Sequence, residues 1–247
     1  MERMEKRMLA TYVNMAAVVI GGLLGLLFRQ RISEKLTRSL MLVLGLCTAV
    51  IGVQSALETA NILVVILCLV LGTLLGELLH LDERIEGAGS FMKRTLLRGR
   101  GGGRFTEGFI SASILFCVGS MAVMGSLDAG IRGDYNIIFA KSAMDFVSSL
   151  AFSAAMGVGV LFSAVPILVF QGGITLLAGW IAPYLSAAVM AEMTAVGGTA
   201  LLGLAVNILD LGKERIRVAN MLPAIFLPIF YFPAAHWITT WIGGLLG

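Results

Sequence analysis

The sequence predicts an all-α protein, a polytopic bundle of about eight transmembrane helices. Of its 247 residues, 58% are hydrophobic and 13% are charged, with a mean hydropathy of +0.93, whereas soluble domains carry about 25% charged residues. Several runs are apolar without interruption and approach the roughly 20 residues that cross a bilayer core. They lack the strict alternation of apolar and polar residues that the strands of a membrane barrel would show.

Eight apolar runs are the expected spans, and together they form one domain over residues 1–247. They cover residues 9–28, 36–57, 62–79, 108–127, 142–162, 166–181, 187–209 and 218–242. A charged start precedes the first run, but no small-x-small cleavage pattern appears in it. We therefore expect this run to stay in the protein as its first helix.

The basic residues predict how the chain is oriented. The connections after the first, third and seventh runs hold four, six and three of the 18 basic residues. Alternating spans place all three connections on one side, and basic loops stay in the cytoplasm. We therefore expect an N terminus outside, although Arg3, Lys6 and Arg7 count against it. Residues 81–107 are expected to be a flexible basic cytoplasmic loop, and no folded module beside it suggests nucleic-acid binding.

Glycine-rich segments recur at the ends of three runs. Gly22 and Gly25, Gly72 and Gly76, and Gly198 and Gly203 each precede a basic connection and a returning run. This similarity indicates helical hairpins in repeat. A simpler interpretation is that the glycines let helices approach closely. Packing of this kind is also compatible with a homodimer.

Two acids, Asp145 and Glu192, lie inside apolar runs, where an ionised carboxylate is costly and is a functional candidate. Ser142, Ser149 and Ser153 recur with Asp145 at helical spacing and line one face. Such a face offers oxygen ligands to a cation. Two other interpretations stay open: the serines join neighbouring helices, and the acids cap a neighbouring helix.

Breaks in the expected helices are the second functional signal. Residues 142–181 number only 40, which leaves no loop between two crossings. The turn from Ser163 to Pro166 must therefore be very tight or re-entrant, and Pro166 frees backbone carbonyls. Gln171, Gly172 and Gly173 add a polar and flexible step, and Asn220 with Pro223 repeats the theme in the last run. Broken helices of this kind are typical of transporter sites.

These features predict a membrane transport protein that handles a small cation, or a small solute coupled to one. Asp145 and Glu192 would supply charge, with neutral ligands from Ser149, Ser153, Gln171 and Asn207 and backbone carbonyls at Pro166 and Pro223. The alternative is a non-transporting membrane scaffold. No H-E-x-x-H, G-x-S-x-G or P-loop motif is present, and the three cysteines lack metal-site spacing. We therefore expect no enzyme and no cofactor, and the identity of any metal stays open.

The chain resembles the YqgA/YdfK family of multi-pass bacterial inner-membrane proteins, a domain-of-unknown-function family often labelled putative transporters. The segments that carry the resemblance are Asn14 with Gly21-Gly22-Leu-Leu-Gly25, Lys141-Ser with Asp145, Gly157 to Pro166, Gln171-Gly-Gly-Ile-Thr-Leu, and Asn207 with Ile216 to Pro223. Family members commonly have Asp-Gly where this chain has Asp145-Phe146. The resemblance implies an inner-membrane location and a site near Asp145 or Asn220.

Overall fold

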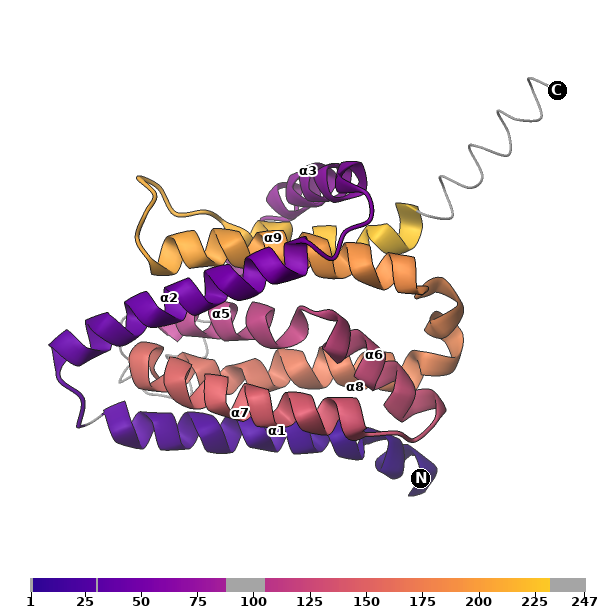
Figure 1. The fold of residues 1–247 in the computed structure, drawn as a ribbon, viewed down its shortest axis with the longest axis horizontal. Helices are drawn as coiled ribbons and strands as arrows, with labels where there is room; N and C mark the ends of the chain where they lie inside the picture. Colours follow the sequence, from indigo (N-terminus) through magenta and orange to yellow (C-terminus); the bar gives the residue numbers. More distant parts are fainter. Residues whose placement is uncertain (1, 30, 88–104, 232–247) are drawn as a thin grey trace.

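The structure is a computed structural model that describes residues 2–29, 31–87 and 105–231. It is a helical bundle, as predicted, and the described residues contain no strand (Figure 1). Its elements are α1 (Glu2–Arg29), α2 (Glu34–Ala56), α3 (Ile62–Leu78), α5 (Phe105–Cys117), α6 (Ser120–Ile131), α7 (Asn136–Met156), the 3-10 helix η1 (Val158–Ser163), α8 (Ala164–Ile181), the 3-10 helix η2 (Ala182–Tyr184), α9 (Ala187–Ile208) and the 3-10 helix η3 (Val218–Phe226).

Each of the first three helices packs against an element from the second half of the chain. The pairs are α1 with α7, α2 with α9, and α3 with η3. Glycines make these contacts, because a β-carbon at Gly25 or Gly76 would overlap the carbonyl oxygen of Leu150 or Asn220. At Gly52 it would lie 3.0 Å from the carbonyl oxygen of Gly198. Close helix approach therefore accounts for these glycines, and the hairpin repeat stays a prediction.

Among the residues that the structure describes, five helices are long and apolar enough to cross a membrane, and the number rises to seven if each of two bent pairs is one span. The segment from Val218 to Tyr231 is a shorter apolar helix, and the rest of the predicted span 218–242 lies outside the described residues. The described chain is thus a multi-pass bundle with five to seven candidate spans.

The predicted span 108–127 is not one straight helix. It separates into α5 and α6, which bend by 61° at Val118 and Gly119. Gly119 has a φ of 119°, which a residue with a side chain rarely adopts. Because glycine also occurs inside membrane helices, the apolar pattern continues through the break and does not reveal it.

The chain turns earlier than the predicted Ser163–Pro166 break. α7 ends at Met156, and Gly157 alone, with a φ of 95°, separates it from η1. Pro166 lies in the first turn of α8, where a backbone amide has no partner within the helix and proline is tolerated. The tight turn that the short span length requires is therefore made by a glycine, followed by one 3-10 segment.

The predicted 81–107 loop is shorter than expected. Residues Leu81–Gly87 form a helix that bends by 55° from α3, and α5 begins at Phe105. Residues 88–104 lie outside the described part of the chain. Both corrections follow from apolar residues such as Leu81, Ile85 and Phe105, which extend each helix into the segment assigned to the loop.

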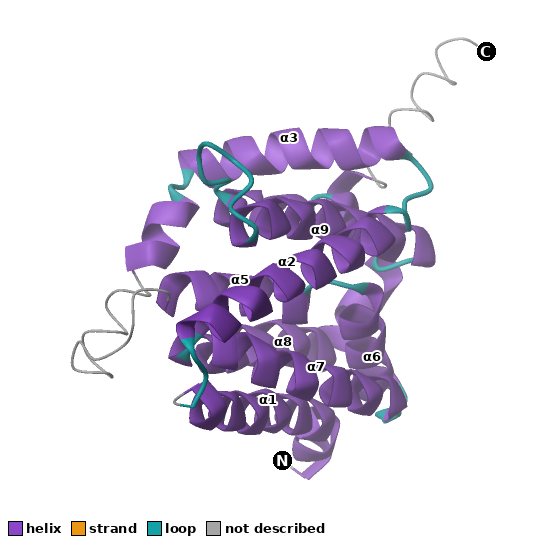
Figure 2. Cartoon of the chain, turned by 60° about the vertical axis from the view of Figure 1, so that its left-hand side comes forward, coloured by secondary structure: helices purple, strands orange, loops and turns teal. Residues whose placement is uncertain are grey.

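The described parts of the three basic connections lie on one face of the bundle, which we call the basic face (Figure 2). Arg215 and Arg217, after α9, pair with Glu86 and Glu77 at distances of 2.9 and 3.5 Å. Arg29, Glu34 and Asp210, from the ends of α1, α2 and α9, line one pocket on this face. The segments 57–61, 132–135 and 182–186, the last of which contains η2, join the opposite ends of their flanking helices and lie on the opposite face (Figure 1).

Candidate functional site

A buried ion pair on α7 is the centre of the candidate site. Lys141 and Asp145 are four residues apart, so they lie one helical turn apart on the same face. The ammonium of Lys141 forms a salt bridge with Asp145 Oδ2, although each residue is only 6% exposed. A charge this deep in a bundle requires a partner, because desolvation is costly. From the sequence, Asp145 was predicted to be a charge without a partner inside an apolar run. In the structure it is paired with the ammonium of Lys141.

Two amide side chains from other helices complete the cluster. The Nδ2 group of Asn14 on α1 donates to Asp145 Oδ2 at 3.0 Å and to Gln171 Oε1 on α8 at 3.2 Å. Both amides are fully buried. Asn14 therefore links the ion pair to Gln171, and three helices meet at four polar side chains. We call Asn14, Lys141, Asp145 and Gln171 the polar cluster.

Several polar atoms at and beside the polar cluster are not satisfied. Asn14 Oδ1, Gln171 Nε2 and Thr175 Oγ1 are buried and have no hydrogen-bond partner among the described residues. Thr175 follows Gln171 by four residues, so it lies one turn further on the same face of α8. Native proteins satisfy most buried polar groups, and exceptions need an explanation. These atoms offer one acceptor, one amide donor and one hydroxyl to a small polar ligand.

The break between α5 and α6 lies beside this cluster. The Lys141 ammonium is 5.9 Å from the centre of the Phe116 ring, a cation–π distance. Gly125 on α6 packs against Ile138, one turn before Lys141 on α7. α6 starts at Ser120 without a side-chain cap. Two helix ends therefore interrupt the bundle near the charged pair, an arrangement typical of transporter sites.

The serines of the predicted stripe mostly bind backbone carbonyls. Ser142 donates to Ile138 and Ser149 donates across to Val18 on α1, at 2.7 and 2.6 Å. Ser163 donates to Val160 within η1. Ser153 Oγ is buried without a partner among the described residues. Only the bond from Ser149 joins two helices, and among these four serines Ser153 is the one whose hydrogen-bonding capacity is unused.

Glu192 lies at a different place from the polar cluster. Its carboxylate accepts from Thr59 Oγ1 at 2.6 Å and from the backbone amides of Ala60 and Asn61 at 3.0 and 3.1 Å. These residues directly precede α3. Glu192 thus satisfies donors at the start of that helix, which corresponds to the capping interpretation that the sequence left open. No group of three His, Cys, Asp or Glu residues is placed to hold a metal among the described residues.

The two other predicted amides bind backbone groups on the basic face, in the loop after α9 and at the start of the helix Leu81–Gly87. Asn207 accepts from the backbone amide of Ile216 at 2.9 Å and donates to its carbonyl at 2.8 Å. Asn220 accepts from the amide of Asp82 at 2.8 Å. Pro223 lies inside η3. Of the predicted ligands, the structure therefore brings together only Asp145 and Gln171.

Gly172 and Gly173 do not break α8. A β-carbon at Gly172 would meet Met8 Cε at 2.8 Å, whereas Gly173 has open space and lines an apolar groove between α5, α8 and η3. The sequence predicted a flexible step at Gln171, Gly172 and Gly173, but the helix α8 continues through these residues. Gly172 permits the approach of α1 instead, which helps to bring Asn14 to Gln171.

Sequence reasoning did not assign Lys141 and Asn14 to the site. Lys141 was visible as a basic residue one helical turn before Asp145. Asn14 was visible as an amide inside the apolar run of α1, although its partner lies 131 residues away. No spacing rule connects residues this distant, so the link between them depends on how α1 packs on α7.

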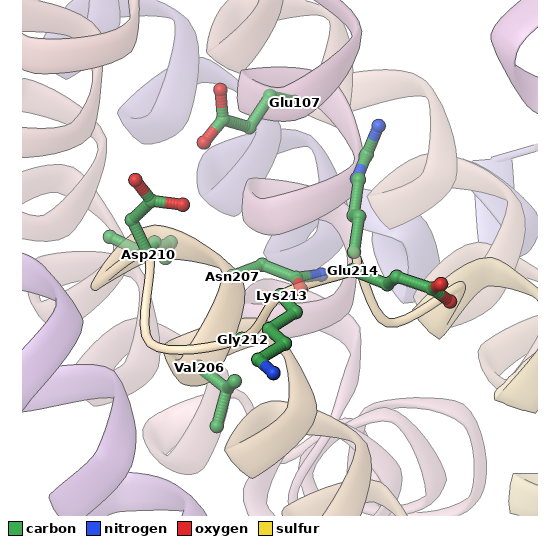
Figure 3. A pocket seen from close by; sticks show the side chains of 9 residues that line it. Glu107, Val206, Asn207, Asp210, Gly212, Lys213 and Glu214 are labelled. Carbon is green, nitrogen blue, oxygen red and sulfur yellow. The ribbon is translucent and has the colours of Figure 1, made fainter.

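A second polar pocket, of about 370 Å³, opens on the basic face. Figure 3 shows its lining, in which side chains of both signs surround the turn after α9: Glu107, Asp210, Lys213 and Glu214 are labelled. Asn207 at its edge already binds the backbone of Ile216. None of the polar cluster residues lines this pocket, which we interpret as an open surface between loops.

The fold and the polar cluster define a polytopic helical membrane protein with a charged pair inside its bundle. The chain belongs to the family described as "Protein of unknown function (DUF554)", whose model matches residues 9–232. It is similar to the uncharacterized protein YqgA of Escherichia coli K12, with 31% identity over 219 residues that cover 87% of this chain and 92% of the relative. It is also similar to the uncharacterized membrane protein YdfK of Bacillus subtilis 168, with 26% identity over 226 residues that cover 90% and 94%. These matches confirm the family resemblance, and no solved structure matches the chain.

Proposed function

We propose that this protein is a transporter of the bacterial cytoplasmic membrane that moves a small solute coupled to a cation. The observation that carries the proposal is the Lys141–Asp145 pair, buried between α1, α7 and α8 beside unsatisfied amide and hydroxyl groups. Ionisable residues inside membrane bundles are costly and typically mark ion or substrate pathways. The break at Val118 and Gly119 beside the pair supports the same proposal, because discontinuous helices commonly form transporter sites.

A solute that moves together with a cation is favoured over a site that binds and moves a cation alone. The Asp145 carboxylate already has a cation, the ammonium of Lys141. A transported cation must therefore compete with Lys141 for the charge of this carboxylate. A proton competes best, because it removes the charge of Asp145 and needs no additional ligands. In this proposal Asp145 is the proton site, and Asn14 and Gln171 position the solute.

We further propose eight crossings with the N terminus outside. The common location of the basic connections supports this topology, because an odd number of crossings separates the N terminus from each of them. The bent pair α5 and α6 counts as one crossing, and the segment from residue 218 supplies the last. A homodimer stays a prediction.

Flux measurements test the proposal directly. Purified protein is reconstituted in proteoliposomes, and uptake of a panel of ions and small solutes is compared for the parent and Asp145→Asn. We expect at least one solute whose accumulation depends on a proton gradient in the parent and not in the variant. Equal gradient-driven accumulation by both proteins would contradict the role of Asp145. Asp128→Asn on α6 is a control, since Asp128 pairs with Arg132 and is not a member of the polar cluster.

A non-transporting scaffold is the second candidate. The hydrogen bond from Ser149 to the Val18 carbonyl and the close glycine contacts favour it, because both join helices without leaving capacity for a ligand. For a scaffold, Asp145→Asn changes assembly or thermal stability in the same way at every pH and with every ion present. Any solute that stabilises the parent but not the variant would count against this candidate.

A further inference from the structure

The polar cluster has a charge balance that restricts what the solute is. As it stands, the ammonium of Lys141 and the carboxylate of Asp145 neutralise each other. The titratable groups near Asp145 are Lys141 on its own helix and the Cys117 thiol on α5, while α1 and α8 contribute the neutral amides of Asn14 and Gln171. The described residues thus provide one positive and one negative group at this position.

Protonation of Asp145 changes this balance. The proton from solution binds a carboxylate oxygen, the salt bridge is lost, and Lys141 stays positive in a site that is almost closed to solvent. An unpaired buried charge is strongly destabilising. Phe116, whose ring faces the ammonium, offers only a weak replacement. The protonated state therefore requires an anion.

Two of the three free polar groups at and beside the pair suit such an anion, because Asn14 Oδ1 can only accept. Gln171 Nε2 and the hydroxyl of Thr175 are buried without partners among the described residues, and both can donate. With Lys141 they provide a cation and two neutral donors from two helices. The matching acceptor is a compact monoanion such as nitrate or a short carboxylate.

Resting on the transport function proposed above, we infer that the solute is a small monovalent anion that binds Lys141 when a proton binds Asp145. One proton and one monoanion move together, so transport is electroneutral. When both leave, the Lys141–Asp145 salt bridge re-forms and closes the empty site. This exchange gives the salt bridge a function in the cycle: it prevents the empty carrier from holding an unpaired charge.

Acidification of liposomes tests this inference. The protein is reconstituted in phosphatidylethanolamine and phosphatidylglycerol vesicles that contain a pH-sensitive dye. Inward gradients of nitrate, chloride, formate or lactate are applied. Sodium and potassium, as cations, and glycerol, as a neutral solute, are tested for comparison. We expect one or more anions to acidify the lumen at least tenfold faster than in protein-free vesicles. Clamping the membrane potential with potassium and valinomycin should leave this rate unchanged.

A binding measurement separates the roles of the two charged residues. Thermal unfolding of the purified protein is followed with 10 to 100 mM nitrate or formate at pH 5 and pH 8, concentrations chosen for weak sites of about millimolar affinity. The parent should be stabilised by the anion at pH 5 only. Asp145→Asn, which resembles the protonated acid, should be stabilised at both pH values but should not acidify vesicles. Lys141→Gln should lose both responses.

The outcomes distinguish this inference from the proposed function. Asp145-dependent uptake of sodium, potassium or glycerol, without anion-driven acidification, overturns the inference and leaves the transport function in place. Anion uptake that follows the membrane potential and not the proton gradient also overturns it. If no probe shows flux that depends on Asp145, and no anion stabilises the protein, both the transport function and this inference are wrong.

Discussion

The Nδ2 atom of Asn14 on α1 lies 3.0 Å from the Oδ2 atom of Asp145 on α7, although 131 residues separate the two in the chain. The same Nδ2 group lies 3.2 Å from Gln171 Oε1 on α8. One amide therefore connects the ion pair of α7 to a third helix. The candidate site depends on this packing as much as on its charged residues.

The first prediction concerns Asn14. Asn14→Leu keeps a similar volume but removes both hydrogen bonds, leaving Gln171 Oε1 without a donor. We expect a loss of about 1–3 kcal/mol in the free energy of unfolding, the typical cost of an unsatisfied buried group. Unfolding in mixed detergent micelles measures it. Thr37→Ala, at an exposed hydrogen bond near the start of α2, is the control and should change stability little.

The ion pair itself predicts a strong coupling between two variants. Lys141→Met and Asp145→Leu each leave one buried charge without its partner, and each should cost about 3–5 kcal/mol. The double variant removes both charges and should cost clearly less than the sum of the two. A double-mutant cycle of unfolding free energies checks this expectation. Additive losses would mean that the two side chains do not interact inside the bundle.

The sequence predicted the helical bundle well because its signal is local. Apolar runs of membrane length fix the approximate helices, and the clustering of Lys and Arg anticipates which loops share a face. The break at Gly119 could not be predicted, because the residues around it are as apolar as a continuous span. Gly157 turns the chain where Pro166 was expected to, since proline in a first helical turn is compatible with helix.

The site was predicted in part for the same physical reason. Asp145 and Gln171 are conspicuous because a polar side chain in an apolar run is rare. Glu192 is equally conspicuous, yet its three donors come from residues 59–61, which only the packing of α9 beside α3 brings close. Burial of an acid is visible in a sequence, but the partner that neutralises it is not.

Glu192→Gln should therefore affect stability and not coupling. The variant weakens the acceptor for Thr59 Oγ1 and for two backbone amides, at a cost of about 1–3 kcal/mol. The same loss should make the 57–61 loop more sensitive to added protease. Proton-coupled flux per folded molecule should equal that of the parent. A selective loss of coupling in Glu192→Gln would instead place this acid on the transport path.

Two glycine variants compare close packing with open space. A β-carbon at Gly25 would overlap the carbonyl oxygen of Leu150, whereas none of the surrounding atoms lies within 4 Å of the same position at Gly179 on α8. Gly25→Ala should separate α1 from α7 and destabilise the protein by about 1–3 kcal/mol, as overpacking typically does. Gly179→Ala should be neutral or stabilise by up to about 1 kcal/mol through helix propensity. Equal effects would contradict the close contact of α1 with α7.

The last prediction concerns orientation and depends on two loops at opposite ends of the bundle. Gly212 follows α9 on the basic face, and Asp134 joins α6 to α7 on the opposite face. Single-cysteine variants Gly212→Cys and Asp134→Cys are made after replacing Cys47, Cys68 and Cys117 with alanine. Because basic loops stay cytoplasmic, an impermeant maleimide should label Asp134→Cys in intact cells and Gly212→Cys only after lysis. The reverse pattern would invert the proposed topology, while labelling of both positions in intact cells would contradict the separation of the two faces.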